Sequence, residues 1–549
     1  MEKNVLLFLE SRTEDLENNI ALGMKSHIGW KELTFKGVGI LSRRLASYLI
    51  DIGIDKGDNV AILSESMPEW GAALFSSILA GSTTVPLDIK LTIYELTSIL
   101  SDCKPKVLLV SSAFLSMAIE LQSKIKSIEH IILIDDNGAN KHYPSIYTLE
   151  DKPDRKWRHR NANKTAFVIY TSGTTGSPKG VEISFKNVFA QVEAIGKCFN
   201  LGPNDRLLSI LPMNHLFELT VGFLSFLNMG TSIYYSKSLK PKDLFALILE
   251  RRITFMVVVP AFLKLLKASI EGEINQLPPF KKSFFKTLYK LSSFVENYPI
   301  RRFLFKNIHK KFGNEFKGFI SGGAPLDINV GRFFEVIGMK VYEGYGLSEA
   351  SPVVCVNTDK AHRLGSVGQP LFNVQAKIDP ETGELLVKGD NVMKGYFNKP
   401  ELTSEVISED GWLKTGDIAK IDKDGFIWIT GRIKNMIVLS GGKKVFPEEV
   451  ESVLEKSPMF AELCVFGAKR LSGQKEGSED ICVRIVPTQK ILEEYSDDKE
   501  LYNAVKSEVK RLAEQLSSFK RPTNIIISKE PLPRTATNKI KRKEIAQLV

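Results

Sequence analysis

With 549 residues, 43% of them hydrophobic and 25% charged, the chain is too long for one ordinary hydrophobic core and too apolar for a disordered protein. Its five cysteines are odd in number, lie far apart and form no CxxC pair, which argues against a disulfide framework or a zinc site and favours a reducing cytoplasm. The net charge of +10 is uneven, because residues 280–317 hold ten Lys or Arg against two Glu and leave only +2 for the rest.

Short β-branched or apolar runs recur along the first half of the chain and predict strands. They cover residues 59–63, 106–110, 130–134, 166–170, 206–211 and 255–259, with helical periodicity between them. This alternation predicts α/β layers with largely parallel sheets. Two uncharged stretches, 70–87 and 219–236, are interrupted by Gly, Ser, Thr or Pro. We therefore expect in each a buried helix running into a strand, and not a membrane-spanning helix.

Residues 280–317 combine the charge excess with ten aromatic residues at spacings that fit amphipathic helices. A surface helical insertion with a solvated basic face is the simpler interpretation. A peripheral contact with the inner face of an anionic membrane is the alternative. No motif that reads nucleic acid accompanies the charge, so we expect no nucleic-acid partner.

After Gly365 the pattern changes to short strands and turns, which predicts a smaller antiparallel module. Beyond Arg432 come a helix start at Pro447, strands around 464–466 and 481–486, another helix and a basic tail. We therefore predict an α/β protein with a large N-terminal domain of parallel-rich sheets plus this module at 1–431. A small α+β C-terminal domain is predicted at 432–549.

The strongest local signal is YTSGTTGSPKG at 170–180, which follows an apolar run and holds three glycines and five Ser or Thr hydroxyls. Such a loop can offer backbone N–H groups and hydroxyls to phosphate oxygens. It is not a Walker A loop, because that motif needs Gly directly before Lys179 and Ser or Thr after it. By itself the loop leaves a phosphate cradle and a plain Gly-rich turn open.

This segment closely resembles the phosphate loop of the adenylate-forming superfamily, which includes acyl-CoA synthetases, peptide-synthetase adenylation domains and firefly-type luciferases. Six further motifs of that superfamily follow in order: LPMNH at 211–215, SGGAPL at 321–326, YEGYGLSEA at 342–350, WLKTGD at 412–417, GRIKNMIVLSGGKKVFPEEVE at 431–451 and PRTATNKIKR at 533–542. The resemblance implies activation of a carboxylic acid as its acyl-AMP with ATP and Mg²⁺, followed by transfer to a thiol such as CoA. It also implies that the C-terminal domain is mobile, with a hinge near Lys434.

The resemblance also assigns roles to single residues of the phosphate and acyl sites. It implies a magnesium ligand at Glu349, with Thr171, and a histidine near the reacting carboxylate at His215. Lys539 matches the lysine that contacts the α-phosphate during adenylation, although Asn538 stands where the superfamily usually has Gly. The implied phosphate cradle consists of Thr171, Ser172, Gly173, Thr174, Thr175, Gly176 and Lys179.

Further residues are implied for the nucleotide and the thiol. Asp417 matches the acceptor of both ribose hydroxyls, and Arg432 its partner. Gly441 and Gly442 would line the channel for the thiol. The implied adenine site consists of Gly323, Ala324, Pro325, Glu343, Gly344, Tyr345, Gly346 and Ser348, where Ser348 replaces the usual Thr.

The stretch NHLFELTVGFLSFL, and FISGGAPL after the basic aromatic segment, resemble long-chain fatty acid–CoA ligases, which implies a long-chain fatty acid as the substrate. Residues 221–224 are apolar or small, as the wall of an acyl channel requires. Core packing of the same residues is the alternative. Glu218 keeps an amino acid open as substrate, since amino-acid-activating relatives place an acid near this point. An acyl carrier protein is the alternative acceptor to CoA, and a non-catalytic acyl-binding membrane scaffold is the alternative outside enzymes.

Overall fold

The computed structural model describes residues 12, 14–27, 29–136, 138–152, 156–158, 160–171, 179–439, 443–469, 479–495, 497–534 and 540–547. The chain forms two compact units. Unit 1 comprises Met1–Ala376, Val387–Leu413 and Lys423–Ile427, and unit 2 comprises Lys377–Leu386, Lys414–Asp422 and Trp428–Val549. Together they give the predicted α/β architecture of a large N-terminal part and a small C-terminal one. The boundary at 431/432 and the hinge near Lys434 stay predictions.

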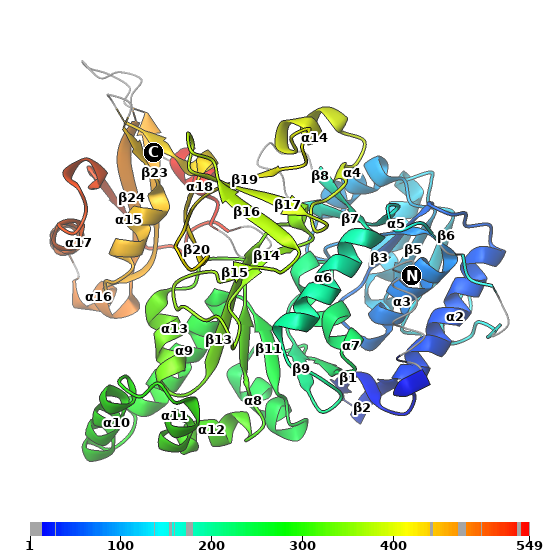
Figure 1. The fold of residues 1–549 in the computed structure, drawn as a ribbon, viewed down its shortest axis with the longest axis horizontal. Helices are drawn as coiled ribbons and strands as arrows, with labels where there is room; N and C mark the ends of the chain where they lie inside the picture. Colours follow the sequence, from blue (N-terminus) through cyan, green and yellow to red (C-terminus); the bar gives the residue numbers. More distant parts are fainter. Residues whose placement is uncertain are drawn as a thin grey trace. The chain divides into compact units, whose positions relative to one another are not determined.

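Two large sheets organise unit 1 (Figure 1). The first, with nine described strands, has the order β15 (Gln369–Pro370), β14 (Val353–Val356), β13 (Lys340–Gly346), β12 (Gly318–Ser321), β11 (Phe255–Val258), β9 (Arg206–Ser209), β10 (Ser232–Tyr235), β1 (Ile20–Ser26) and β2 (Gly29–Thr34). Pairings from β13 through to β1 are parallel, and those of β2, β14 and β15 are antiparallel.

The second sheet, with seven described strands, has the order β18 (Gly395–Tyr396), β8 (Lys179–Ser184), β7 (Thr165–Thr171), β4 (Thr83–Pro86), β3 (Asn59–Leu63), β5 (Val107–Val110) and β6 (His130–Leu133). The pairings from β7 through β4, β3 and β5 to β6 are parallel. The β7–β8 and β8–β18 pairings are antiparallel. All six strands predicted from apolar runs are present in the two sheets. Short β-branched runs favour strands that helices cover on both faces.

Helices connect and cover these sheets. In unit 1 they are α2 (Phe35–Asp51), α3 (Pro68–Ala80), α4 (Ile93–Cys103), η1 (Ser112–Phe114), α5 (Leu115–Lys124), α6 (Phe185–Cys198), η2 (Glu218–Ser225), α7 (Phe226–Asn228), α8 (Pro241–Glu250), α9 (Pro260–Asn275), α10 (Pro279–Ser292), α11 (Tyr298–Leu304), α12 (Lys306–Phe312), α13 (Ile328–Val336), η3 (Ser348–Ala350) and α14 (Pro400–Val406).

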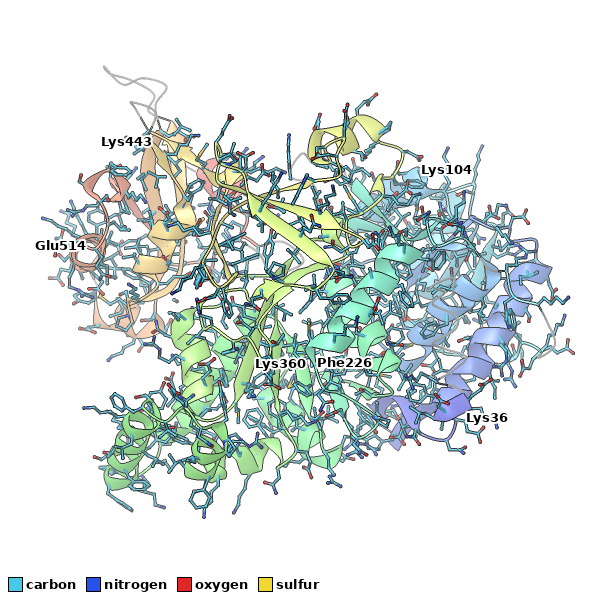
Figure 2. The ribbon with its side chains drawn as sticks, viewed as in Figure 1. Lys36, Lys104, Phe226, Lys360, Lys443 and Glu514 are labelled. Atoms are coloured by element: carbon cyan, nitrogen blue, oxygen red, sulfur yellow. The ribbon has the colours of Figure 1, made fainter. Side chains whose placement is uncertain are left out.

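The two uncharged stretches form buried helices followed by strands, as predicted. Every residue of α3 is buried, and β4 follows it. The π-helix η2 is also buried, and α7 and β10 come next; Phe226 of α7, labelled in Figure 2, is fully buried. Within the described residues, no helix combines the length and the apolarity that crossing a membrane requires. The amphipathic helices predicted at 280–317 are α10, α11 and α12, which lie together at the lower left of Figure 1.

Unit 2 has its own core. Its sheet runs β23 (Phe460–Lys469), β24 (Glu479–Pro487), β25 (Asn524–Ile527), antiparallel and then parallel. Buried Val450, Val465, Val483 and Val505 belong to one cluster, which joins this sheet to α15 and α17. The other elements are η4 (Ile433–Asn435), β21 (Ile437–Val438), β22 (Lys444–Val445), α15 (Pro447–Leu454), α16 (Gln489–Glu494), α17 (Asp498–Ala513), η5 (Ser518–Lys520) and α18 (Arg542–Gln547), with parts of the small sheet β16 (Val374–Ile378), β17 (Glu384–Gly389), β19 (Leu413–Ile421) and β20 (Ile427–Arg432).

Candidate active site

The Gly-rich segment connects two antiparallel strands of the seven-stranded sheet. Thr171 ends β7, Lys179 begins β8, and the two residues are directly opposite each other in the β7–β8 register. Ser172, Gly173, Thr174, Thr175 and Gly176 lie outside the described residues. The hairpin therefore brings the first hydroxyl and the lysine of the predicted phosphate cradle to the same end of the sheet.

Lys179 and Glu349 are joined through a tyrosine that the sequence analysis did not identify. The Nζ of Lys179 lies 5.3 Å from the ring centroid of Tyr396, a distance at which a cation is attracted to an aromatic face. The Tyr396 hydroxyl donates a hydrogen bond of 2.8 Å to Oε1 of Glu349. Burial and the nearby Glu349 carboxylate raise the pKa of Tyr396 above its ordinary value, so its hydroxyl stays protonated and acts as a donor.

Strand pairing fixes this arrangement. The short strand β18 pairs with β8 so that Tyr396 stands opposite Val181, two residues after Lys179. Glu349 lies in the single turn of η3, and its carbonyl accepts the N–H of Met393 at 2.9 Å. Because these contacts join segments far apart in the chain, local spacing gave no signal for Tyr396.

The predicted adenine site lies at the carboxyl ends of β12 and β13. These parallel neighbours place Ser321 opposite Glu343, and the exposed turn Gly323, Ala324, Pro325 follows β12. Gly323 has a φ of +83°, a conformation that favours glycine. Ligands of parallel α/β sheets bind at this edge, so the position suits a nucleotide.

Glu343 holds this turn through a hydrogen bond to its backbone. Its side chain is 6% exposed, and Oε1 accepts the N–H of Leu326 at 3.3 Å, while Oε2 has no hydrogen-bond partner among the described residues. Burial raises the pKa of Glu343 to about 7. The carboxyl group therefore holds the turn in place, and the backbone of the segment stays available for a base.

Gly344, Tyr345 and Gly346 form the end of β13, where the chain meets β14. A Cβ atom on Gly346 would lie 1.8 Å from the carbonyl oxygen of Pro352, so no other residue fits without a backbone shift. Ser348 and Glu349 follow at once in η3. The close approach therefore requires glycine at position 346, three residues before Glu349.

His215 and Glu218 follow β9, at the same edge of the nine-stranded sheet. His215 is half-buried, and its carbonyl accepts the N–H of Leu219 at 2.9 Å. Glu218 is 0% exposed and accepts a hydrogen bond of 2.5 Å from Oγ of Ser209. Burial raises the pKa of Glu218 to about 8, so the group is mostly neutral at pH 7.

The residues predicted to line an acyl channel are packed in the core of unit 1. Val221, Phe223 and Leu224 are all buried. The Phe223 ring lies 5.8 Å from that of Phe75 and 6.5 Å from that of Trp70. Core packing, the alternative in the sequence analysis, therefore describes their contacts in this structure.

In unit 2, Asp417 and Arg432 form the expected pair. Asp417, on β19, is 1% exposed, and Nε of Arg432 donates to its Oδ1 at 2.6 Å. Lys434 is exposed in the turn η4 directly after β20. Gly441, Gly442 and Lys539 lie outside the described residues.

The described residues on either side of 535–539 are held in place by contacts within unit 2. Arg534 and Ile540, which flank the undescribed residues, form an antiparallel bridge. Arg542 donates to both carboxylate oxygens of Glu451 at 2.6 and 2.7 Å and to the carbonyl of Val465 at 2.8 Å. The basic tail is therefore held to the core of unit 2 by a largely buried ion pair, which its sequence did not indicate.

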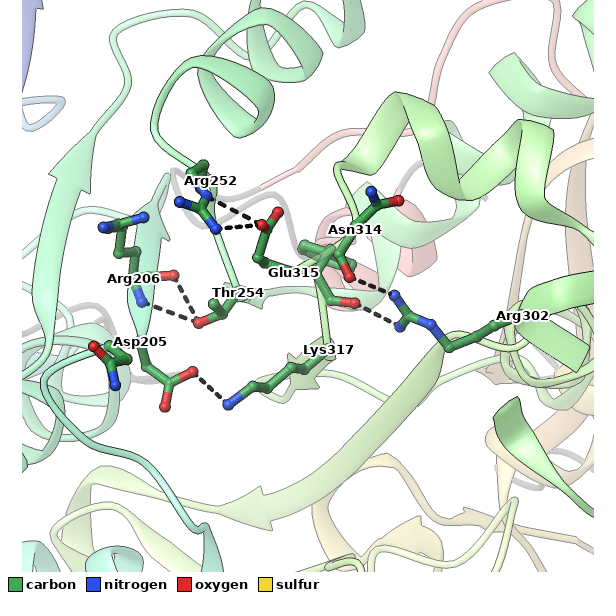
Figure 3. Close-up of a pocket in the computed structure, with 10 residues that line it drawn as sticks. Asp205, Arg206, Arg252, Thr254, Arg302, Asn314, Glu315 and Lys317 are labelled. Atoms are coloured by element: carbon green, nitrogen blue, oxygen red, sulfur yellow. Dashed lines mark hydrogen bonds and ion pairs between the residues drawn. The ribbon is translucent and has the colours of Figure 1, made fainter. Parts of the chain in front are cut away.

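A cavity of about 550 Å³ lies at the opposite edge of the nine-stranded sheet, at the amino ends of β9, β11 and β12 (Figure 3). Its charges are largely paired within the wall: Arg252 with Glu315 and Lys317 with Asp205, each at 2.6 Å. Because it lies away from the carboxyl ends of the strands, we do not assign it to the active site.

Comparison with known proteins identifies the family. The family model for AMP-binding enzymes matches residues 10–397, and that for the AMP-binding enzyme C-terminal domain matches residues 434–548. Long-chain-fatty-acid–CoA ligase FadD15 of Mycobacterium bovis is 29% identical over 461 residues, covering 80% of this chain and 76% of the relative. The 2-succinylbenzoate–CoA ligase of Bacillus subtilis is 29% identical over 526 residues, covering 93% and 92%.

Among solved structures, the o-succinylbenzoate CoA synthetase of Bacillus subtilis, in complex with its acyl-adenylate intermediate, superposes with a TM-score of 0.76 at 26% identity, covering 98% of this chain and 97% of that one. The similar proteins thus act on different acids by name. They agree on the reaction type.

Proposed function

The chain belongs to the AMP-binding enzyme family and is an AMP-forming acid–CoA ligase, and from this premise we propose that it activates a long-chain fatty acid with ATP and transfers the acyl group to CoA. The choice of a long-chain fatty acid rests on the similarity to ligases named for that substrate. The observation that carries the ATP-dependent step is the junction of Lys179, Tyr396 and Glu349 beside the β7–β8 hairpin. It joins a cation and a carboxylate beside a loop rich in hydroxyls, which is what phosphoryl chemistry requires.

In the first half-reaction, an oxygen of the fatty acid carboxylate attacks the α-phosphorus of ATP. The bond from that phosphorus to the bridging oxygen of the β-phosphate breaks, and pyrophosphate leaves with the electron pair. Lys179 and the hydroxyls of the loop, with Thr171 first, offset the negative charge that builds up on the phosphates. Lys539 is proposed to contact the α-phosphate and the carboxylate at this stage.

The oxygen donors fit a magnesium ion. Mg²⁺ prefers oxygen ligands and commonly takes one or two from the protein and the rest from phosphates and water. Glu349, with one oxygen fixed by Tyr396, and the Thr171 hydroxyl are of this kind. Bound there, Mg²⁺ would neutralise phosphate charge and orient pyrophosphate as a leaving group.

The nucleotide is proposed to lie against the turn Gly323, Ala324, Pro325, with Tyr345 at its other face. Asp417 is proposed to accept the ribose hydroxyls, with Arg432 holding its carboxylate in place. Two buried carboxyl groups support these assignments, because Glu343 accepts the N–H of Leu326 beside the turn and Asp417 accepts from Arg432. A binding site needs such fixed groups to orient a substrate.

In the second half-reaction, the CoA thiol loses its proton to water and its sulfur attacks the acyl carbonyl carbon. The bond from that carbon to the phosphate oxygen of AMP breaks, and AMP leaves with the electron pair. We propose that the segment carrying Lys539 leaves the carbonyl before the thiol approaches, by rotation near Lys434. Gly441 and Gly442 would then border the thiol channel. An acyl carrier protein remains the alternative acceptor.

Glu218 supports a fatty acid over an amino acid. A site for an amino acid needs an accessible, charged carboxylate to pair with the ammonium group. Glu218 is fully buried and its raised pKa keeps it mostly neutral at pH 7. The half-buried His215 is then the polar group we propose beside the reacting carboxylate, with no proton transfer assigned to it.

The test is acid-dependent release of pyrophosphate, measured with a panel of long-chain and short-chain fatty acids, 2-succinylbenzoate and amino acids. We expect the highest kcat/KM with a long-chain fatty acid, and thioester formation on addition of CoA. Highest activity with 2-succinylbenzoate or an amino acid would contradict the proposed substrate. Release of pyrophosphate with none of the acids would favour a non-catalytic acyl-binding scaffold.

We propose the cytoplasm as the setting, with the enzyme at the inner membrane face, where a long-chain acid partitions. All five cysteines are free, which supports a reducing compartment.

A further inference from the structure

The helix α10 has two apolar faces, and the body of unit 1 covers one of them. Phe285, Leu288 and Tyr289 pack against the core. The Phe285 ring lies 5.5 Å from that of Phe305, and the Tyr289 ring stacks at 6.1 Å on that of Phe333. A surface helix normally has one such face, so these contacts are enough to hold α10 in place.

The other apolar face points away from the core. Phe280, Phe284 and Leu291 recur at spacings of four and seven residues, which puts them on one side of the helix. They are 70%, 67% and 59% exposed, and Phe294, just after the helix, is 79% exposed. With Phe303 of α11, this region holds four of the five exposed phenylalanines among the described residues. So many exposed aromatic rings in one region indicate a binding surface.

The charged residues of α10 itself all have one sign. Exposed Lys281, Lys286 and Lys290 belong to α10, and residues 280–295 contain no acidic residue. Around α10, α11 and α12 the side chains project outward (Figure 2). Lysine stems lie along apolar surface while their ammonium groups reach water or an anionic headgroup.

We propose that this aromatic–basic face, made of Phe280, Phe284, Leu291 and Phe294 with Lys281, Lys286 and Lys290, docks on an anionic lipid bilayer. The proposal deepens the membrane setting that is part of the proposed function, and it does not depend on which acid is activated. The helix lies in the plane of the interface, with its rings among the acyl chains and its lysines against the headgroups.

A bilayer and an acidic protein place different requirements on a basic, aromatic surface. A bilayer binds exposed rings and lysines without one-to-one contacts, whereas a protein partner needs specific pairs of residues across the interface. The lysines of this face have no ion pair among the described residues, and Lys281 lies 5.9 Å from the ring of Phe280. That arrangement matches the belt of basic and aromatic residues of an interfacial helix.

The experiment is co-sedimentation of the full chain with vesicles of phosphatidylcholine alone or of phosphatidylcholine mixed with phosphatidylglycerol. One variant replaces three rings, Phe280→Ser, Phe284→Ser and Phe294→Ser. A second variant neutralises three lysines, Lys281→Gln, Lys286→Gln and Lys290→Gln. Matched controls carry the same kinds of change on other surfaces: Tyr94→Ser with Phe372→Ser, and Lys90→Gln with Lys360→Gln, where Lys360 is labelled in Figure 2.

We expect the wild type and both controls to bind the mixed vesicles. The ring variant should bind at least about 1000-fold more weakly, since each of the three rings contributes about tenfold or more. The lysine variant should lose about 100-fold on mixed vesicles, at about fivefold per charge, and little on phosphatidylcholine alone. All replaced side chains are exposed, so thermal unfolding should not change.

Absence of wild-type binding to mixed vesicles would overturn the proposal, as would equal binding by the ring variant. A loss of the same size in the controls would also overturn it, because the effect would not belong to this face. Acyl-CoA formation from a long-chain fatty acid supplied on serum albumin, without vesicles, serves as the second readout. It should be the same in all variants, and its failure would count against the catalytic proposal alone.

Discussion

Tyr396 offers the sharpest test of the active-site geometry, because one hydroxyl connects it to the proposed magnesium ligand. Tyr396→Phe keeps the ring 5.3 Å from Lys179 and removes the 2.8 Å hydrogen bond to Glu349. A hydrogen bond to a charged acceptor contributes about 1.5–3 kcal/mol. If this hydrogen bond holds Glu349 in the productive orientation, kcat/KM of Tyr396→Phe for acyl-AMP formation should be about 10- to 100-fold lower than that of the wild type.

Tyr396→Leu also removes the aromatic face from Lys179. A cation on an aromatic ring contributes about 0.5–1 kcal/mol at a partly exposed site, so this variant should lose a further two- to fivefold or so. The assay is acid-dependent exchange of pyrophosphate into ATP, repeated over a range of Mg²⁺ concentrations. Because the hydroxyl acts on Glu349, Tyr396→Phe should need more Mg²⁺ for half-maximal rate.

Tyr94→Phe is the matched control, since Tyr94 is 85% exposed. It should leave exchange unchanged. If Tyr396→Phe matched the wild type in rate and in Mg²⁺ requirement, with an unchanged melting temperature, the hydroxyl would have no part in orienting Glu349 and the reasoning would be refuted.

Three further changes test other parts of the structure. Arg542→Ala should destabilise unit 2 by roughly 3–5 kcal/mol in urea unfolding, because it leaves the buried Glu451 without its partner; a loss below about 1 kcal/mol would show that the pair is effectively a surface one. Lys539→Ala should slow acyl-AMP synthesis by about 10²- to 10³-fold and leave thioester formation from supplied acyl-AMP near the wild-type rate, so equal loss in both half-reactions of a folded variant would contradict its role. Glu218 has a pKa raised from 4.5 to about 8, so the folded state binds its proton more tightly and this group's contribution to stability falls as pH rises between those values. Glu218→Gln, which keeps an acceptor for Ser209, should therefore show a shallower fall in unfolding free energy over this range, and parallel pH profiles of the two proteins would rule out the raised pKa.

The sequence by itself determined the reaction type, through its ordered motifs, and six strands of the two large sheets. Strands such as β3 and β11 were predicted to within one residue, because a run of β-branched residues needs no distant partner to be recognised as a buried strand. The Gly-rich loop between β7 and β8 and the acid Glu349 were identified from ordered motifs, since phosphate chemistry restricts which residues can stand there.

Only the tertiary structure decided how these residues meet. Tyr396 reaches Glu349 because β18 pairs with β8, a contact between segments more than 200 residues apart that no local period encodes. The contacts of Glu218 and Arg542 were equally hidden, because the sequence kept Glu218 open only as a partner for an amino-acid substrate and placed Arg542 only in a basic tail. Burial in η2 makes the first mostly neutral, and two carboxylates at the core of unit 2 hold the second. Burial and long-range pairing depend on the whole fold, which is why the chemistry of these groups became visible only once the chain was folded.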